Sequence, residues 1–502
     1  KIREYTEMKI GVLAERSPFF LISILAIFKI NAIYVPLIPS VPDDRMVNMI
    51  QQADVRVILT QEKFYDKVQK LKGKCSAMFI TYLDNFELNQ NDVTSTLCNM
   101  SKIEDKYNNR IHEDNGAYIL FTSGTSGVPK GVMVTHKGMM NMLKSAYDIW
   151  NLRKEDVIVG MTQFGFDMSI PELMISLAKG LKLLLLDDKC CSNPKRALKQ
   201  IKLYRATVFQ TTPSRFKQLI TVPESYRMLA SIDRLVLGGE IIDKSIVKYV
   251  KQNMNCKLYN TYGLTETSVF STVKEIIDAV SIGTPIYNTE IYIVDKELNV
   301  LPENEKGEIC ISGVGLGKYL EQSYNCQRIV RIHPESKEVF LTGDFGYIYQ
   351  NELYYICRND NQIKVNGYRI ETEEIVECIV ESKLVFDAMV LSNYYAENNV
   401  ELIAYIIPKI DYTEEKLREY LKLHILEYAI PHKFVCVSEY PLNCNGKIDI
   451  KELRKRSTNN RELECKEYSK LETQLIRIWE TILNVKVDIY DDFFKLGGDS
   501  LK

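Results

Sequence analysis

One segment of the chain concentrates residue types that are suited to binding a phosphate group. FTSGTSGVPKG, residues 121–131, holds three glycines, four hydroxyl side chains and the ammonium group of Lys130. Glycines let backbone N–H groups approach an anion, hydroxyls add donors, and lysine adds a positive charge. The spacing does not match the G-x-x-x-x-G-K-[ST] pattern of the common nucleotide-binding loop. Considered alone, the segment fits a phosphate-binding loop and a flexible surface loop about equally well.

Other short segments also carry groups that could act on a substrate, namely FDMS (166–169), NTYGLTE (260–266), LTGD (341–344) and NGKID (445–449). Each has a purely structural interpretation as well. Glu266 could be a surface turn residue, Tyr262 a core tyrosine with a satisfied hydroxyl, and Lys447 a solvated lysine at a hairpin tip. A lone Thr-Gly-Asp is often only a β-turn. The order of these segments along the chain must therefore decide between the interpretations.

The composition argues against several classes of function. Lys and Arg total 64 against 66 Asp and Glu, so no long-range positive field would gather nucleic acid or an anionic membrane. The 12 cysteines form no Cys-x-x-Cys pair and there are five histidines, which favours free thiols in a reducing compartment over a zinc site. The apolar run at 18–28 is too short to span a bilayer and lacks the lead-in of a signal peptide. We expect a buried helix there and a cytoplasmic protein.

The elements that position these segments predict an α/β protein. From residue 10 to about residue 262, short apolar runs such as GAYILFT alternate with helical patterns, as in parallel sheets buried on both faces. After Ala279, turn-separated runs such as KGEICISG predict hairpins and a small barrel-like sheet. From about residue 361 the pattern predicts a compact α+β region, with one helix beginning at Thr372 and another capped by Thr413. A polar stretch follows, and then a last helix with an apolar stripe at Leu471, Leu475, Ile478 and Ile482.

The motifs occur in the order found in the acyl-adenylate-forming enzymes, which the chain resembles. The matching segments are 28–37 (FKINAIYVPL), 116–131, 166–169, 260–266, 307–320 (GEICISGVGLGKYL), 341–344, 357–375 and 445–449. FDMS together with the GGDS of 497–500 resembles, more specifically, an amino-acid-activating adenylation domain of a nonribosomal peptide synthetase followed by its carrier protein. The departures are Asn31 and Cys357 where glycine is usual, Leu264 where proline is usual, and Tyr347 where a polar or basic residue is frequent.

The resemblance implies a division into domains. Residues 1–358 would form the large N-terminal subdomain, whose start is missing, and 359–456 a small mobile C-terminal subdomain. Residues 457–468 would be a linker and 469–502 part of a helical peptidyl carrier domain. Asp360 corresponds to the hinge between the two subdomains. Ser500 corresponds to the attachment site of 4′-phosphopantetheine, although it could also be a simple helix cap.

The resemblance also implies roles in ATP chemistry. Thr122, Lys130, Glu266 and Lys447 would be catalytic: the loop holds the β and γ phosphates, Glu266 helps bind Mg²⁺, and Lys447 bridges substrate carboxylate, ribose and α-phosphate. Tyr262 would stack on adenine and Asn260 would hydrogen-bond the edge of that base. Asp344 would accept hydrogen bonds from the ribose hydroxyls, with Arg358 nearby. The full nucleotide-binding set is Ser123, Gly124, Thr125, Gly127, Gly238, Gly239, Glu240, Asn260, Tyr262, Gly263, Thr265, Asp344 and Arg358.

The substrate pocket follows from the same alignment of motifs. Its predicted residues are Asp167, Met168, Pro171, Gln210, Val236, Gly238, Thr261, Val269 and Phe270. Asp167 would pair with the α-ammonium of an amino acid. No second charge lines the set, so charged side chains fit poorly. The combination resembles glycine-activating pockets. Glycine is therefore the expected substrate, alanine the second choice and a branched aliphatic amino acid the third. The alternative is a pocket for a medium-sized apolar substrate.

These roles imply partners and leave two rival functions. The partners would be a small amino acid, the carrier domain in cis, neighbouring synthetase modules and a phosphopantetheinyl transferase, with no nucleic acid and no membrane. One rival is an acyl-CoA synthetase-like ligase, which Asp167 and the appended carrier argue against. The other is a catalytically silent scaffold, which the intact Glu266, Asp344 and Lys447 argue against.

Overall fold

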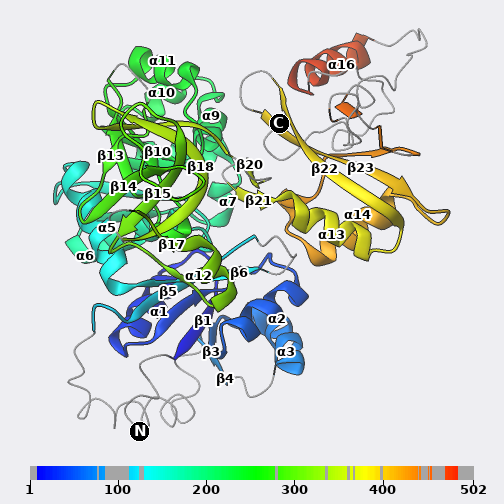
Figure 1. The fold of residues 1–502 in the computed structure, drawn as a ribbon, viewed down its shortest axis with the longest axis horizontal. Helices are drawn as coiled ribbons and strands as arrows, with labels where there is room; N and C mark the ends of the chain where they lie inside the picture. Colours follow the sequence, from blue (N-terminus) through cyan, green and yellow to red (C-terminus); the bar gives the residue numbers. More distant parts are fainter. Residues whose placement is uncertain are drawn as a thin grey trace. The chain divides into compact units, whose positions relative to one another are not determined.

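The computed structural model forms two compact units, which comprise residues 8–358 and 362–483 of the described part of the chain. The described part of the first unit contains three β-sheets and their helices, and that of the second contains a three-stranded and a two-stranded sheet with helices (Figure 1). The structure describes residues 8–75, 79–84, 112–123, 129–277, 281–333, 337–358, 362–365, 368–395, 399–438, 440–441, 450, 453–454 and 470–483.

The first sheet is seven-stranded, in the order β16-β6-β5-β2-β1-β3-β4, and its last five strands are parallel. Strands β6 and β16 add antiparallel pairs at one edge. The strands are β1 (Lys9–Leu13), β2 (Ile33–Pro36), β3 (Val55–Thr60), β4 (Phe79–Tyr82), β5 (Gly116–Thr122), β6 (Lys130–Thr135) and β16 (Lys318–Tyr319). The helices that connect them are α1 (Pro18–Lys29), α2 (Asp43–Gln52) and α3 (Tyr65–Lys74), with a short turn η2 (Glu62–Phe64).

The second sheet is also seven-stranded, in the order β13-β12-β11-β10-β9-β7-β8, and is parallel from β11 to β8. Its strands are β7 (Val157–Gly160), β8 (Lys182–Leu185), β9 (Val208–Thr211), β10 (Arg234–Gly238), β11 (Lys257–Tyr262), β12 (Thr272–Glu275) and β13 (Thr284–Pro285). The helices around it are α5 (His136–Ile149), α6 (Ser169–Lys179), α7 (Asp188–Cys191), α8 (Pro194–Leu203), α9 (Pro213–Ile220), α10 (Ser225–Met228) and α11 (Lys244–Asn253). A 3₁₀ turn, η3 (Thr265–Thr267), follows β11.

The second sheet is buried on both faces, as its unalternating apolar runs predicted. In β10, Val236 packs in the cluster with the first sheet, α5 and α6, whereas Leu235 and Leu237 pack in the cluster with helices α8 to α11. Successive side chains of a strand point to opposite faces, so a strand between two cores has no polar side. Figure 1 shows α9, α10 and α11 beside this sheet.

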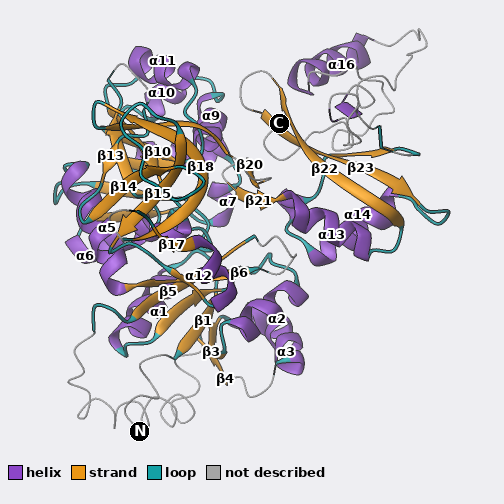
Figure 2. Ribbon diagram, viewed as in Figure 1, coloured by secondary structure: helices purple, strands orange, loops and turns teal. Residues whose placement is uncertain are grey.

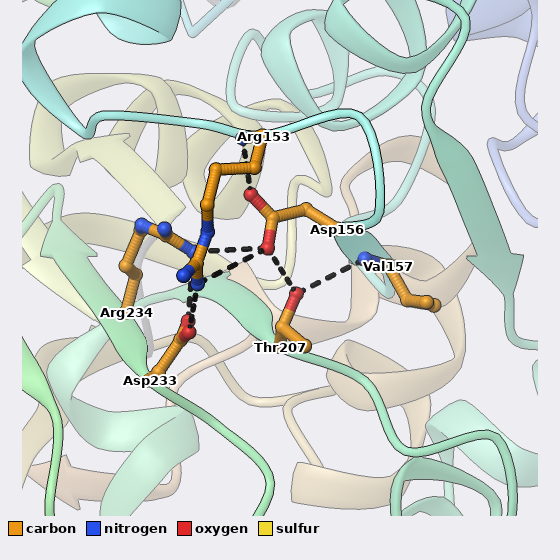
Figure 3. A network of polar contacts seen from close by, with 6 residues as sticks. All are labelled: Arg153, Asp156, Val157, Thr207, Asp233 and Arg234. Atoms are coloured by element: carbon orange, nitrogen blue, oxygen red, sulfur yellow. Dashed lines mark hydrogen bonds and ion pairs between the residues drawn. The ribbon is translucent and has the colours of Figure 1, made fainter.

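A partly buried ionic network lies at the amino ends of β7, β9 and β10 (Figure 3). Arg234 Nη1 donates to Asp156 Oδ1 at 3.0 Å, and the Thr207 hydroxyl donates to the same oxygen at 2.8 Å. Arg234 also pairs with Asp233 at 2.8 Å, and Arg153 contacts both aspartates. The side chains of Arg234 and Asp156 are almost fully buried, so each charge depends on its partner. The network therefore joins the amino ends of these strands, opposite the carboxyl ends that carry the predicted site.

The third sheet is antiparallel, with order β14-β15-β18-β17 and β19 paired to β18, which matches the hairpins expected after Ala279. Its elements are β14 (Thr289–Val294), β15 (Gly307–Gly313), α12 (Gln322–Arg328), β17 (Ile329–Arg331), β18 (Glu338–Tyr349) and β19 (Glu352–Arg358).

The second unit has the expected α+β pattern, with α13 and α14 on one side of a three-stranded sheet (Figure 2). Ile375 and Ile379 are buried, and Thr413 Oγ1 accepts from Lys416 N at the start of α14, as predicted. The elements are β20 (Gln362–Val365), β21 (Tyr368–Glu371), α13 (Thr372–Glu381), β22 (Val385–Tyr395), β23 (Asn399–Pro408), α14 (Glu414–His424), η4 (Glu427–Ala429), β24 (Lys433–Cys436) and α16 (Lys470–Leu483).

The apolar run at 18–28 does form a helix, but the prediction that it is buried is only half right. Phe20, Ile24 and Ile27 of α1 are buried, whereas Phe19 and Ile22 are 40% and 57% exposed among the described residues. One face of α1 packs on the first sheet and the other does not. Within the described ranges, no helix has the length and apolar character needed to cross a membrane.

Candidate active site

Most of the predicted site residues lie at one edge of the second sheet. The carboxyl ends of β9, β10 and β11 are adjacent in register, and these ends carry Gln210, Gly238 and Tyr262. The segments that leave β10 and β11 carry the remaining predicted groups, among them Glu240 and Glu266. In open parallel sheets, ligands bind beyond the carboxyl ends of the strands. The topology therefore brings together motifs that are far apart in the sequence.

Tyr262, Asp344 and Arg358 form one hydrogen-bonded group. The Tyr262 hydroxyl donates to Asp344 Oδ2 at 2.7 Å, and Arg358 Nη1 donates to Asp344 Oδ1 at 2.9 Å. Asp344 on β18 and Arg358 on β19 are register partners, which explains how residues in separate motifs meet. Burial, and then the adjacent Asp344 carboxylate, raise the pKa of Tyr262 well above its ordinary value, so its hydroxyl keeps its proton. A carboxylate fixed by two donors is a suitable acceptor for vicinal hydroxyl groups.

Two residues that are predicted to contact the nucleotide are hydrogen-bonded to other groups of the protein. Asn260 is buried in β11, and its Nδ2 donates to the carbonyl of Ser281 at 2.9 Å. Glu240 Oε2 accepts from Ser214 N at 2.9 Å in the first turn of α9. An acceptor at a helix N-terminus satisfies an orphan backbone N–H. Glu240 therefore stabilises the start of α9 in addition to its predicted role.

Glu266 is buried, so its interpretation as a surface turn residue is wrong. It is 2% exposed, its Oε1 accepts from the Tyr319 hydroxyl at 2.6 Å, and its carbonyl accepts from Gly317 N at 2.8 Å. The described residues contain no group of three or more His, Cys, Asp or Glu that could hold a metal by themselves. Mg²⁺ is commonly bound by one or two carboxylates together with substrate phosphates and water, and a single oriented carboxylate fits that mode.

Lys130 lies at the start of β6, opposite Thr122 at the end of β5, so the two residues close the hairpin that carries the predicted phosphate loop. The Thr122 hydroxyl donates to the Lys130 carbonyl at 3.4 Å. The Lys130 ammonium lies 4.6 Å from the ring centroid of Tyr324, and the residue is 9% exposed. Lys130 is therefore a sheltered cation beside the loop and does not extend freely into solvent.

Asp167 of the FDMS motif is tied to the segment that carries Glu266. Its Oδ2 accepts from the Thr265 hydroxyl at 2.7 Å. Asp167 also contributes, after burial, to raising the pKa of Tyr118, whose buried hydroxyl has no hydrogen-bond partner among the described residues. The predicted amine-binding carboxylate and the predicted metal-binding carboxylate thus come from adjacent segments.

The predicted pocket residues make specific contacts with one another. Gln210 Nε2 donates to the Met168 carbonyl at 2.7 Å, and a Cβ at Gly238 would lie 2.2 Å from Thr261 Oγ1. Gly239 adopts φ +81°, a left-handed conformation that favours glycine. Val236 and Pro171 are buried in β10 and α6.

Phe270, another of the predicted pocket residues, packs near an aromatic neighbour. Phe270 is buried, and its ring centroid lies 5.7 Å from that of Trp150. Val269 has φ +77°, which is strained for a β-branched residue. Trp150 was not predicted, because nothing in its sequence context connects the end of α5 with residue 270.

Several contacts at the site were missed by the sequence analysis. Tyr319 belongs to the quoted GKYL segment, so the motif marked it without indicating a role. Tyr324 and Asn325 of α12 carried no signal, and neither did Gln52, whose Oε1 accepts from Gly131 N at 2.9 Å. The predicted residues that lie outside the described part of the chain are Gly124, Thr125, Gly127, Asp360, Lys447 and Ser500.

Comparison with known proteins defines the class. The model of the AMP-binding enzyme family matches residues 5–319. The chain is 31% identical over 522 residues to polyketide synthase PksN of Bacillus subtilis (strain 168), covering 99% of this chain and 9% of that protein. It is 30% identical over 507 residues to gramicidin S synthase 2 of Brevibacillus brevis, covering 98% of this chain and 11% of that protein. The chain thus spans about a tenth of the length of these relatives.

Solved structures agree with this class. Holo-AB3403, a four-domain nonribosomal peptide synthetase bound to AMP and glycine, is 27% identical with a TM-score of 0.61, covering 99% of this chain and 36% of that chain. The Vibrio cholerae adenylation domain AlmE, solved in complex with glycyl-adenosine-5′-phosphate, shares the fold with a TM-score of 0.78 at 18% identity. The match covers 90% of this chain and 88% of that chain.

The chain therefore belongs to the AMP-binding enzyme family and is of the adenylation type found in nonribosomal peptide synthetases. The predicted fold class and the class of adenylating ligase are confirmed at this level, and the match to the AMP-binding family supports the predicted binding of AMP.

Proposed function

We propose that the chain activates glycine, or another small amino acid such as alanine, as aminoacyl-AMP with release of pyrophosphate. The observation that carries this proposal is the 2.7 Å hydrogen bond between Asp167 and Thr265, one residue before Glu266. A carboxylate held there supports recognition of an α-ammonium beside the phosphate-binding groups. A fatty or aryl acid has no cation for Asp167 to pair with, so the carboxylate would add no favourable charge pairing to the binding of such a substrate.

The residues divide the first half-reaction among them. Asp344, held by Tyr262 and Arg358, would accept hydrogen bonds from the ribose hydroxyls. The 122–130 hairpin would hold the β and γ phosphates. Glu266 would hold Mg²⁺, which supplies positive charge at the phosphates. Lys447 would bridge the substrate carboxylate and the α-phosphate while pyrophosphate leaves. Their common contribution is positioning and stabilisation of the charge that develops on the phosphate oxygens.

The preference for a small side chain rests on pocket residues that cannot easily move apart. A Cβ at Gly238 would lie 2.2 Å from Thr261 Oγ1, Gln210 Nε2 donates to the Met168 carbonyl, and the Phe270 ring packs near that of Trp150. This close packing supports a pocket with little room for a larger side chain. Two similar proteins were solved with glycine or a glycyl adenylate, which supports the same preference. One methyl group is worth about 1–3 kcal/mol, so alanine would react roughly 10- to 200-fold more slowly than glycine.

The second half-reaction would transfer the aminoacyl group to the thiol of 4′-phosphopantetheine on Ser500, installed by a phosphopantetheinyl transferase. Rotation of the small subdomain about Asp360 would move Lys447 away from the adenylate and admit the thiol of the carrier in its place. The neighbouring modules of a cytoplasmic synthetase would then extend the peptide. The multidomain relatives support this context, and the domain boundaries at 358, 456 and 468 are part of the proposal.

The test is exchange of labelled pyrophosphate into ATP, measured with each of the twenty amino acids and with fatty and aryl acids. We expect the highest rate with glycine, and at least a hundredfold loss in Asp167→Ala. Asp188→Ala, an exposed aspartate on α7, is the matched control and should keep the wild-type rate. Exchange with no amino acid would refute amino acid activation, and a maximum with a large side chain would refute only the preference for glycine.

A further inference from the structure

The segment 317–325 contacts both charged groups that face the phosphates in the proposed function. It binds Glu266 twice, through Gly317 N to the Glu266 carbonyl at 2.8 Å and through the Tyr319 hydroxyl to Oε1 at 2.6 Å. The Tyr319 side chain is buried, and its phenol is a donor to an ionisable oxygen. A short bond from a hydroxyl to a carboxylate is among the stronger hydrogen bonds in proteins. Glu266 is therefore held at its backbone and at its side chain by the same segment.

Tyr319 is itself fixed by a two-point clamp from α12. Asn325 Oδ1 accepts from Tyr319 N, and Asn325 Nδ2 donates to the Tyr319 carbonyl, each at 2.8 Å. Tyr319 also pairs with Val132 of β6, so its backbone is bound on two sides. A side chain on a backbone fixed in this way loses little freedom when it makes one more hydrogen bond.

The same helix reaches the predicted phosphate-binding lysine. The Tyr324 ring lies 5.6 Å from the Tyr319 ring and 4.6 Å from the Lys130 ammonium. A cation over an aromatic face is attracted by the ring quadrupole, and more strongly when water is excluded. Two neighbouring tyrosines therefore contact one anion and one cation of the site.

We propose that Tyr319 is a positioning residue that orients the Glu266 carboxylate for the divalent cation of bound ATP, whereas Tyr324 positions Lys130 for the phosphates. The proposal rests on the proposed function, since it takes Glu266 as the metal-binding carboxylate. Hydrogen bonds to ligating carboxylates fix their orientation, and their loss commonly costs 10- to 100-fold in metal affinity. The competing explanation is that Tyr319 only fills the core and its hydroxyl is merely satisfied there.

The two explanations differ in how ATP binding depends on the cation. The affinity of the 502-residue chain for ATP is measured calorimetrically with Mg²⁺ and with EDTA, and the ratio of the two affinities is the coupling. Tyr319→Phe keeps the ring and removes only the hydroxyl. We expect the coupling to fall about tenfold, with the affinity in EDTA unchanged. Tyr324→Leu should weaken ATP about equally in Mg²⁺ and EDTA, because it acts through Lys130.

A double-mutant cycle gives the second readout. Glu266→Gln should remove the coupling, and Tyr319→Phe added to it should cause no further loss. Asn325→Ala, which loosens Tyr319 without removing it, should lower the coupling in the same direction and serves if Tyr319→Phe fails to fold. Tyr347→Phe in β18, whose ring stacks on Tyr354, is the matched control and should leave the coupling unchanged.

Equal weakening of ATP with and without Mg²⁺ in Tyr319→Phe, or an unchanged coupling, would overturn the proposal. So would losses that add up in the double variant. These measurements need no amino acid substrate. A chain that shows normal coupling but no pyrophosphate exchange would therefore refute the proposed function while leaving the role of Tyr319 intact.

Discussion

Glu172, in the first turn of α6, yields a prediction whose magnitude follows from the structure. Its carboxylate is fully buried and accepts hydrogen bonds from the Thr162 hydroxyl, from Met161 N at 2.9 Å and from Thr162 N at 3.0 Å. Burial outweighs these donors and the nearby Arg16, and raises the pKa of Glu172 from 4.5 to about 7. A tenfold change in proton affinity corresponds to about 1.4 kcal/mol, so the shift corresponds to about 3 kcal/mol.

The sign of the effect follows from proton linkage. Between pH 4.5 and about 7 the unfolded chain has lost the Glu172 proton and the folded chain retains it. The free energy of unfolding contributed by this group therefore falls as the pH rises through that range, and is constant above it. Glutamine resembles the protonated acid at every pH. We expect Glu172→Gln to raise stability relative to wild type by about 1 kcal/mol at pH 5 and by about 3 kcal/mol at pH 8.

The assay is urea unfolding at pH 5 and pH 8, followed by the fluorescence of Trp150, which is buried in the first unit. Trp479 in α16 is replaced by phenylalanine so that one unit is observed. Glu155→Gln makes the same change at an exposed position and is the control for the substitution itself. If Glu172→Gln instead destabilises the first unit at pH 8, the backbone donors and Arg16 outweigh burial, and the reasoning is refuted.

Two further predictions concern packing in the second sheet. Gly238→Ala should lower stability by about 1–3 kcal/mol and pyrophosphate exchange more than tenfold, because the new methyl meets Thr261 Oγ1 at 2.2 Å. Thermal unfolding should show partial recovery when Thr261→Ala is added, and no recovery would mean that another contact is responsible. Asp156→Ala should cost about 3–5 kcal/mol in urea unfolding, because it leaves Arg234 buried beside Asp233 alone. The KM for ATP should not change, and adding Arg234→Leu should restore part of the stability.

Features that depend on local sequence could be predicted well. Apolar runs predicted the parallel strands, because a strand that is buried on both faces has no polar side. The Thr413 cap and the start of α13 at Thr372 followed from single residues and their spacing. The order of the motifs was enough to predict the family. Each of these signals lies within one segment, so no knowledge of neighbouring segments was needed.

Contacts between distant segments were decided only by the tertiary structure. The sequence suggested that Tyr262 and Asp344 share a site, but the fold makes the tyrosine hydroxyl a donor to that aspartate, 82 residues away. Tyr319 and Glu266 meet across 53 residues because β16 pairs with β6, and no local pattern encodes that pairing. The exposed face of α1 likewise depends on what packs against it. Composition and periodicity determine which elements form, whereas side-chain partners depend on strand order and register, which are set by the packing of the whole unit.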